Sequence, residues 1–226
     1  MKKIVSIIFT LALLVPLLVL MGNPVEVSAA IPFYDVKKSA WYYDEVEYCY
    51  NNYLMRGVSD TSFAPEAKLT RAMFVRVLAE LSDEPFGKYY HTCFTDVPLY
   101  EWYTAATTWA YENKIVSGTG NGKFSPHKAI TREEACVMIS KYLQAYGVKI
   151  NKNTNVLNNY RDSDKISSWA REGVAAAINS GIVSGVSYNT MNPKGIINRA
   201  SCARLAMLTD VLYPDAKREE YKPWYN

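Results

Sequence analysis

The segment "ITREEA" (residues 130–135) has the features of a helix start, and two near-copies of it occur in the chain. Thr131 is a good N-cap residue, and Glu134 three positions later completes a capping-box pattern. Arg132 falls at the first helical position, where a cation opposes the roughly half-unit positive charge of a helix N-terminus. The near-copies are "LTRAMF" (69–74) and "INRASC" (197–202). The sequence thus places an arginine at the electrostatically unfavourable end of three helices.

Four landmark residues recur in register around these segments. The spacing from the first copy to the second is 61 residues, the spacing from the second to the third is 67, and Trp precedes Arg by 30 residues in every copy. Self-similarity at a long period identifies a repeat protein. The extra six residues of the second period lie in a polar linker, 143–160. The landmarks are Trp41, Trp102 and Trp169; Gly57, Gly118 and Gly185; Pro65, Pro126 and Pro193; and Arg71, Arg132 and Arg199.

Each repeat is predicted to form two helices joined by a nine-residue loop. The first helix follows the Trp, with apolar positions at helical spacing, and it is expected to end near the repeated Gly. An apolar residue before each Pro is expected to pin the loop to the core; these plug residues are Phe63, Phe124 and Met191. The second helix begins after Thr70, Thr131 or Asn198 and carries an apolar stripe. One helix pair cannot bury that stripe, so we predict a mainly all-α fold with a central three-helix bundle, one helix from each repeat.

The N-terminus has the pattern of an export signal. A basic "MKK" is followed by a long apolar run and then by "VEVSAA", which ends in small residues. We expect cleavage near Ala29 or Ala30; the alternative is an uncleaved membrane anchor, because the apolar run is just long enough to span a bilayer. The predicted divisions are a signal peptide (1–29), three repeats (30–88, 89–149 and 150–214) and a polar C-terminal tail (215–226).

Composition and motif content argue against several classes of function. The chain has 226 residues, 49% of them hydrophobic and 21% charged, and a formal charge of +3, so it is globular and lacks a broad basic surface for nucleic acid. No G-x-S-x-G or phosphate-binding loop occurs, and "HTC" (91–93) is only a weak metal hint that we interpret as a chance feature of a loop. We therefore predict no catalytic site, no metal and no cofactor. Three of the four cysteines lie in predicted helices, which favours core thiols over disulfides; the four are Cys49, Cys93, Cys136 and Cys202.

Further motifs give the chain a family resemblance. "FYDV" (33–36) and "FTDV" (94–97) open the first two repeats, "YRDS" (160–163) opens the third, and "KIVSG" and "GIVSG" follow the first helix of repeats 2 and 3. With the "ITREEA" segments, this pattern resembles three tandem S-layer homology (SLH) domains over about residues 32–212. The resemblance implies a pseudo-threefold fold around a central three-helix bundle. It also implies a secreted protein held non-covalently to the cell wall of a bacterium with a Gram-positive-type wall, and no membrane partner after signal cleavage.

The resemblance also implies a ligand and a set of candidate residues. The ligand is an acidic secondary cell-wall polysaccharide, commonly bearing a pyruvate ketal, bound in grooves between adjacent repeats. An Arg fork can hold a carboxylate with two hydrogen bonds, and a helix N-terminus adds N–H groups for the same anion. The alternative is that each Arg pairs with an Asp of its own or a neighbouring repeat. The candidates are Arg71, Arg132, Arg199, Asp35, Asp96, Asp162, Trp41, Trp102, Trp169, Gly57, Gly118 and Gly185.

Residue-level interpretations refine this set. We expect the Arg132 and Arg71 grooves to bind better than the Arg199 groove, because repeat 3 departs most from the family pattern. The Trp residues could stack on sugars, but the sequence favours wedging against the core. Glu134 is interpreted as a helix cap rather than a ligand contact, and the three Gly as left-handed caps or close-approach positions. The competing functions are an adaptor or structural surface-layer protein that binds another wall protein, and a small exported enzyme.

Overall fold

The computed structural model describes residues 30–217, of which residues 31–217 belong to one compact unit. The predicted signal peptide (1–29) and most of the predicted tail lie outside the described residues. Within 30–217 the chain is helical and contains no strand, only isolated bridges. None of these helices is long and apolar enough to cross a membrane. The elements are α3 (Tyr43–Asn51), α4 (Arg71–Leu81), η1 (Phe86–Lys88), α5 (Thr104–Glu112), α6 (Arg132–Ala145), η2 (Thr154–Asn159), η3 (Ser163–Lys165), η4 (Ser168–Ala170), α7 (Arg171–Asn179) and α8 (Arg199–Leu212).

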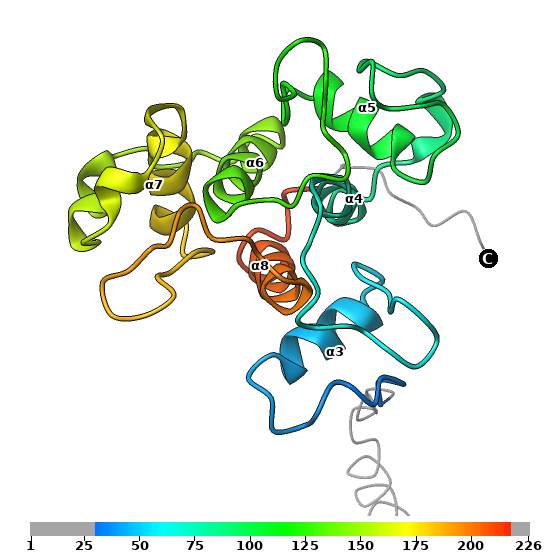
Figure 1. The fold of residues 1–226 in the computed structure, drawn as a ribbon, viewed down its shortest axis with the longest axis horizontal. Helices are drawn as coiled ribbons and strands as arrows, with labels where there is room; N and C mark the ends of the chain where they lie inside the picture. The colour runs from blue at the N-terminus through cyan, green and yellow to red at the C-terminus, as the bar shows by residue number, and fades with distance from the viewer. Residues whose placement is uncertain (1–29, 218–226) are drawn as a thin grey trace, which may run out of the picture. The chain divides into compact units, whose positions relative to one another are not determined.

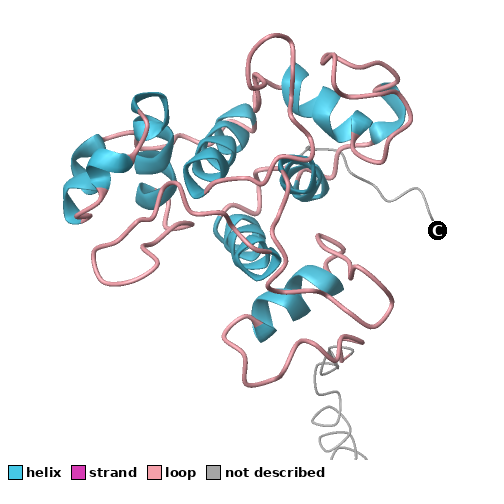
Figure 2. Cartoon of the chain, in the orientation of Figure 1, coloured by secondary structure: helices cyan, strands magenta, loops and turns pink. Residues whose placement is uncertain are grey.

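The second helices of the three repeats form the centre of the fold, as Figures 1 and 2 show. Helix α4 contacts both α6 and α8, and the first helices α3, α5 and α7 lie outside this group. Each outer helix packs against the inner helix of a different repeat: α3 against α8, α5 against α4, and α7 against α6. The predicted three-helix centre is therefore confirmed, and the repeats are interlocked, because every outer helix depends on a neighbour for its packing.

A closed ring of backbone hydrogen bonds joins the segments just before the three inner helices. The N–H of Leu69 donates to the C=O of Ile197 at 3.0 Å, that of Ile197 to Ile130 at 3.2 Å, and that of Ile130 back to Leu69 at 3.0 Å. All three side chains are buried. Since each repeat supplies one donor and one acceptor, the ring is complete only when all three repeats are present.

The loops between the two helices of each repeat are anchored as predicted. The plug residues Phe63, Phe124 and Met191 are completely buried. Phe33 and Phe94, from the openings of repeats 1 and 2, lie against the first two plugs, with ring centroids 5.6 and 5.4 Å apart. The core-thiol prediction is also confirmed: all four cysteines are free, and Cys93 alone is only partly buried.

The repeated Gly does not end the first helix, and this part of the prediction is wrong. Helix α3 stops at Asn51, six residues before Gly57, and the left-handed residue that turns the chain after it is Tyr53 (φ 59°). The corresponding residues in the other repeats are Lys114 and Gly181. Gly57 is instead a close-approach position, because a Cβ there would lie 2.3 Å from the carbonyl oxygen of Ser59.

Candidate functional site

The three arginines at the helix starts reach across repeat boundaries to the plug loops. The Nε of Arg71 donates to the C=O of Phe124 at 2.9 Å. Arg132 makes the same bond to Met191 at 2.9 Å. Arg199 closes the cycle, with a bond to Phe63 at 2.7 Å. Each Arg thus holds the loop of the next repeat, and this bond helps to offset the unfavourable helix dipole, a cost of about 0.3–1 kcal/mol.

The three aspartates bind the opposite end of the same plug residues. Asp96 accepts hydrogen bonds from the backbone N–H groups of Phe124 and Ser125, at 2.7 and 2.8 Å. Asp35 and Asp162 hold the other two plugs in the same way. Burial alone would raise the pKa of each carboxyl group, but these backbone hydrogen bonds outweigh it and lower the pKa.

No Arg–Asp ion pair therefore forms between the candidate residues in the described part of the chain. The Asp carboxylate takes the N–H of the plug, and the Arg of the preceding repeat takes its C=O. The alternative of direct Arg–Asp pairing is wrong. The two residue types share the task of fixing one loop, which explains why both recur with the same spacing.

The helix N-termini do not offer the free N–H groups that the sequence suggested. The N–H of Arg132 donates to Gly195 and that of Glu133 to Pro193, at 2.9 and 3.0 Å. The Thr131 hydroxyl accepts the next N–H, and Glu134 completes the predicted capping box. Helices α4 and α8 are closed in the same manner. A ligand at these sites would have to use guanidinium groups and side chains rather than the helix backbone.

A groove of about 460 Å³ lies beside Arg132 and combines residues from all three repeats. Arg132 comes from repeat 2, Trp41 from repeat 1, and the segment 182–186 with Arg204 from repeat 3. One terminal nitrogen of Arg132 donates to the C=O of Ser184 at 2.8 Å. A guanidinium has five N–H donors, and this one makes two bonds to described residues, so further donors remain for a ligand.

A second groove, of about 1030 Å³, is formed by the equivalent residues around Arg199, so that each part comes from the next repeat in the cycle. Arg199 comes from repeat 3, the segment 52–58 and Arg76 from repeat 1, and Trp102 from repeat 2. Arg199 is largely buried, and burial lowers its pKa. Its terminal nitrogen donates to the C=O of Arg56 at 2.6 Å.

The surroundings of Arg71 differ, because a protein carboxylate already occupies the equivalent place. Glu134 lies 3.3 Å from Arg71, whose side chain is only 4% exposed, and Lys128 also binds Glu134 at 3.0 Å. The corresponding residues facing Arg132 and Arg199 are Ser201 and Met73, which carry no charge. Glu134 therefore caps its helix, as predicted, and neutralises Arg71 as well.

Helices α6 and α7 pack closely at the position that corresponds, by sequence register, to the second arginine of the two grooves. A Cβ on Gly173 would lie 2.6 Å from a methyl group of Val137, so the two helices touch there. Val137 stands where the two described grooves have Arg76 and Arg204. The expected order, with Arg71 above Arg199, stays a prediction; the two grooves contain Arg132 and Arg199 respectively.

The repeated Trp residues are exposed, which overturns the wedge interpretation. Trp41, Trp102 and Trp169 are 57%, 51% and 59% exposed. The first two stand edge-to-face against the Tyr that follows each of them, with centroids 5.3 and 5.1 Å apart. Large apolar rings held in solvent beside arginines form a surface on which a sugar ring could stack.

The second arginine of each groove was not among the site residues predicted from the sequence. Arg76 and Arg204 follow the helix-start arginines by five positions in repeats 1 and 3, and repeat 2 has Val137 there. Arg204 is half exposed and pairs with Glu45 of repeat 1 at 2.8 Å. Comparison of the three second helices in register would have detected this position.

Comparisons with known proteins place these features in a family. A model described as "S-layer homology domain" matches residues 32–73, 94–136 and 159–202. Relatives include an exoglucanase, XynX, of Acetivibrio thermocellus (33% identity over 83% of this chain and 17% of its own length). An S-layer protein of Bacillus thuringiensis subsp. finitimus shows 26% identity over 92% of this chain and 24% of its own. A cellulosome-anchoring protein of A. thermocellus shows 28% identity over 67% of this chain and 34% of its own. The chain therefore spans only 17–34% of the length of these relatives.

Proposed function

The chain belongs to the S-layer homology family, and from this membership we propose that it binds an acidic polysaccharide of the bacterial cell wall without a covalent bond. Relatives named as an S-layer protein and a cellulosome-anchoring protein support a location at the cell surface. The match to an exoglucanase covers 17% of that enzyme, and the matching region of this chain is its SLH repeats. We therefore infer a binding role rather than a catalytic one.

The observation that carries the proposal is the pairing of arginines with an exposed Trp in two grooves. Arg132 and Arg204 line one groove, and Arg199 and Arg76 line the other. Arg204 is paired with Glu45 and Arg76 with Glu80, so of these four arginines only Arg132 and Arg199 carry a charge that no carboxylate of the described residues compensates. A pyruvate ketal carries one carboxylate on a rigid ring, and an arginine with unused N–H donors can bind it with charge-assisted hydrogen bonds. Trp41 or Trp102 then offers a face for the sugar.

We propose that the three positions are unequal and that the Arg71 position does not bind the polysaccharide. Glu134 already compensates the charge of Arg71, so an anionic sugar would have to displace an existing ion pair. Arg132 and Arg199 face uncharged Ser201 and Met73 at the equivalent place. A carboxylate ligand therefore gains more at these two positions.

The test measures binding of the protein to purified wall polysaccharide with and without its ketal groups. Trp41→Ala and Trp102→Ala are each expected to weaken binding roughly tenfold, because a stacked ring and its apolar contact are lost. Trp169→Ala is the matched control, since Trp169 is equally exposed and lines neither of the two grooves. By the cyclic register of the repeats it corresponds to the Arg71 position. Equal binding of ketal-free polymer would contradict the carboxylate mechanism, and an equal loss in Trp169→Ala would contradict the ranking.

The alternative is that the repeats bind another surface-layer protein rather than a glycan. The exposed Trp residues and the two arginine-rich grooves would also suit an acidic protein surface. Walls stripped of polysaccharide distinguish the two functions. The glycan function requires binding to be lost on stripped walls, whereas a protein partner would preserve it.

A further inference from the structure

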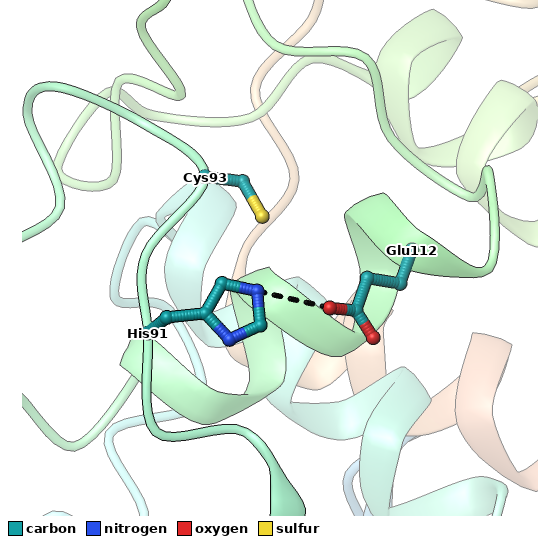
Figure 3. A group of neighbouring side chains, drawn as sticks. All are labelled: His91, Cys93 and Glu112. Atoms are coloured by element: carbon teal, nitrogen blue, oxygen red, sulfur yellow. Dashed lines mark ion pairs between the residues drawn. The ribbon is translucent and has the colours of Figure 1, made fainter.

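Three side chains of types that bind metal ions meet in repeat 2, away from the residues that line the two grooves. His91 and Cys93 lie on the segment between η1 and α5, and Glu112 is the last residue of α5. Figure 3 shows the imidazole ring, the thiol and the carboxylate directed toward a common space. The Nε2 atom of His91 is 3.0 Å from a carboxylate oxygen of Glu112. One ligand atom from each of the three residues lies within 4.8 Å of the other two.

These separations are close to those of a tetrahedral zinc site. Zinc bonds of about 2.0–2.3 Å at tetrahedral angles place ligand atoms about 3.3–3.8 Å from one another. The His91–Glu112 distance of 3.0 Å and the 4.8 Å limit on the other separations bracket this range. Imidazole nitrogen, thiolate sulfur and carboxylate oxygen are also the three ligand types that Zn²⁺ uses in proteins.

The backbone that carries the two loop ligands is already held in place. Thr108 of α5 donates a hydrogen bond from its hydroxyl to the C=O of His91, at 2.8 Å. Thr92, between the two ligands, exchanges hydrogen bonds with the backbone of Phe94, which is buried in the core. The loop is thus fixed to the helix that supplies the third ligand, so little conformational entropy remains to be lost on binding.

The SLH fold itself does not need these residue types. In register with the openings of the other repeats, the position of Cys93 is occupied by Pro32 and by Asn159. The position of Glu112 is Asn51 in repeat 1 and Asn179 in repeat 3. Because repeats 1 and 3 form the same helix–loop–helix unit without this ligand set, the cluster is a feature added to repeat 2.

Charge and solvent access also suit a divalent ion. A thiolate and a carboxylate supply two negative charges, and a neutral imidazole completes a site that is uncharged once Zn²⁺ is bound. The side chains of His91 and Glu112 are 59% and 43% exposed, so an ion can enter directly from solvent. Burial raises the pKa of the Cys93 thiol, and the nearby charge of Glu112 raises it further, to a smaller extent. Because zinc binds the thiolate, the ion must displace the thiol proton.

We propose that His91, Cys93 and Glu112 form a zinc site with three protein ligands and one position open to water. The ion would fasten the segment before α5 to the C-terminal end of that helix. This inference is independent of polysaccharide binding, because none of the three residues lines the two grooves.

The experiment titrates the untagged, reduced and metal-free protein with Zn²⁺ by calorimetry and with Co²⁺ by absorption spectroscopy. We expect one ion per chain and, for Co²⁺, a thiolate-to-metal charge-transfer band together with the intense visible bands of a tetrahedral site. The thermal midpoint should rise with Zn²⁺, because the ion binds the folded state. A Co²⁺ complex without the charge-transfer band would overturn the proposal, whatever the behaviour of any variant.

Variants then test each ligand. Cys93→Ser should abolish the charge-transfer band and weaken Zn²⁺ binding at least about tenfold, and His91→Gln and Glu112→Gln should each weaken it by a similar factor. His127→Gln is the control, because it removes the other histidine of the chain, which lies beside Tyr103 instead. Wild-type zinc affinity in Cys93→Ser, or an equal loss in His127→Gln, would refute the site.

Discussion

At the scale of single residues, the recurring Arg and Asp are explained by the two backbone polar groups of one plug residue. Asp96 binds the N–H of Phe124, and Arg71 binds its C=O. The plug side chain is buried between them, so neither backbone group can be hydrated and each needs a partner from the protein. The arginine that looked misplaced at a helix start is thus required by a loop of the next repeat.

The aspartates predict how stability depends on pH. The pKa of Asp96 is lowered in the folded state, so its contribution is present above the unfolded value of about 3.9 and is lost as pH falls through the folded pKa. Urea midpoints measured between about pH 5 and pH 2 should therefore decline. Asp96→Asn should flatten this decline and cost about 1–2 kcal/mol at neutral pH, discounted for the partial solvent exposure of the carboxylate. Asp60→Asn, on an exposed loop, is the control, and an unchanged pH profile in Asp96→Asn would contradict the assignment.

At the scale of elements, the turn after each outer helix depends on two different positions. The chain reverses at a left-handed residue just after the helix, which is Tyr53, Lys114 or Gly181. The repeated Gly, several residues later, lets the loop pass close to the opening of its own repeat: a Cβ on Gly118 would lie 2.9 Å from Phe94. The recurrence of this Gly in the three repeats is therefore explained by the close packing of the loop, and not by the end of the helix.

Gly57 provides a test of this distinction. Gly57→Ala should lower the free energy of unfolding by about 1–3 kcal/mol, because the new methyl group would meet backbone oxygens of Ser59 and Ser62. Gly87→Ala is the control, since its nearest neighbour would be 3.9 Å from the Cβ. The measurement is urea denaturation of both variants. Equal stabilities would mean that the loop relaxes freely and that close approach does not explain the glycine.

At the scale of the whole molecule, each repeat completes another. The outer helix of repeat 1 packs on the inner helix of repeat 3, and the backbone ring of Leu69, Ile130 and Ile197 closes through all three repeats. The Arg-to-plug bonds follow the same cycle. Residues 31–217 should therefore unfold as one cooperative unit rather than as three independent repeats.

Removing repeat 3 tests this cooperativity. A fragment of residues 31–149 loses the partner of α3 and leaves the backbone ring open, so we expect it to lack a cooperative urea transition. Residues 31–217 should show a single transition followed identically by circular dichroism and tryptophan fluorescence. A cooperative transition in the shorter fragment would show that the repeats fold without one another.

Much of the fold could be predicted because its signals are local. The in-register Trp, Gly, Pro and Arg define the repeats, the N-caps at Thr70 and Thr131 mark helix starts, and the apolar stripes require a shared core. The plug residues were found from their place before Pro. Each of these inferences depends on periodicity or on neighbours within a few residues, which the chain displays directly.

The candidate site needed the tertiary structure, because its arginine-to-loop contacts join residues 53 to 136 positions apart. Arg71 and Arg132 stand in the same sequence pattern, but only Arg71 meets a glutamate, and Trp41 lines a groove whose other residues come from repeats 2 and 3. His91 and Glu112 approach each other only because a loop folds back on α5. The sequence by itself determined the units and their number; the packing of those units decided which arginines remain available to a ligand, since charge compensation depends on distance in space.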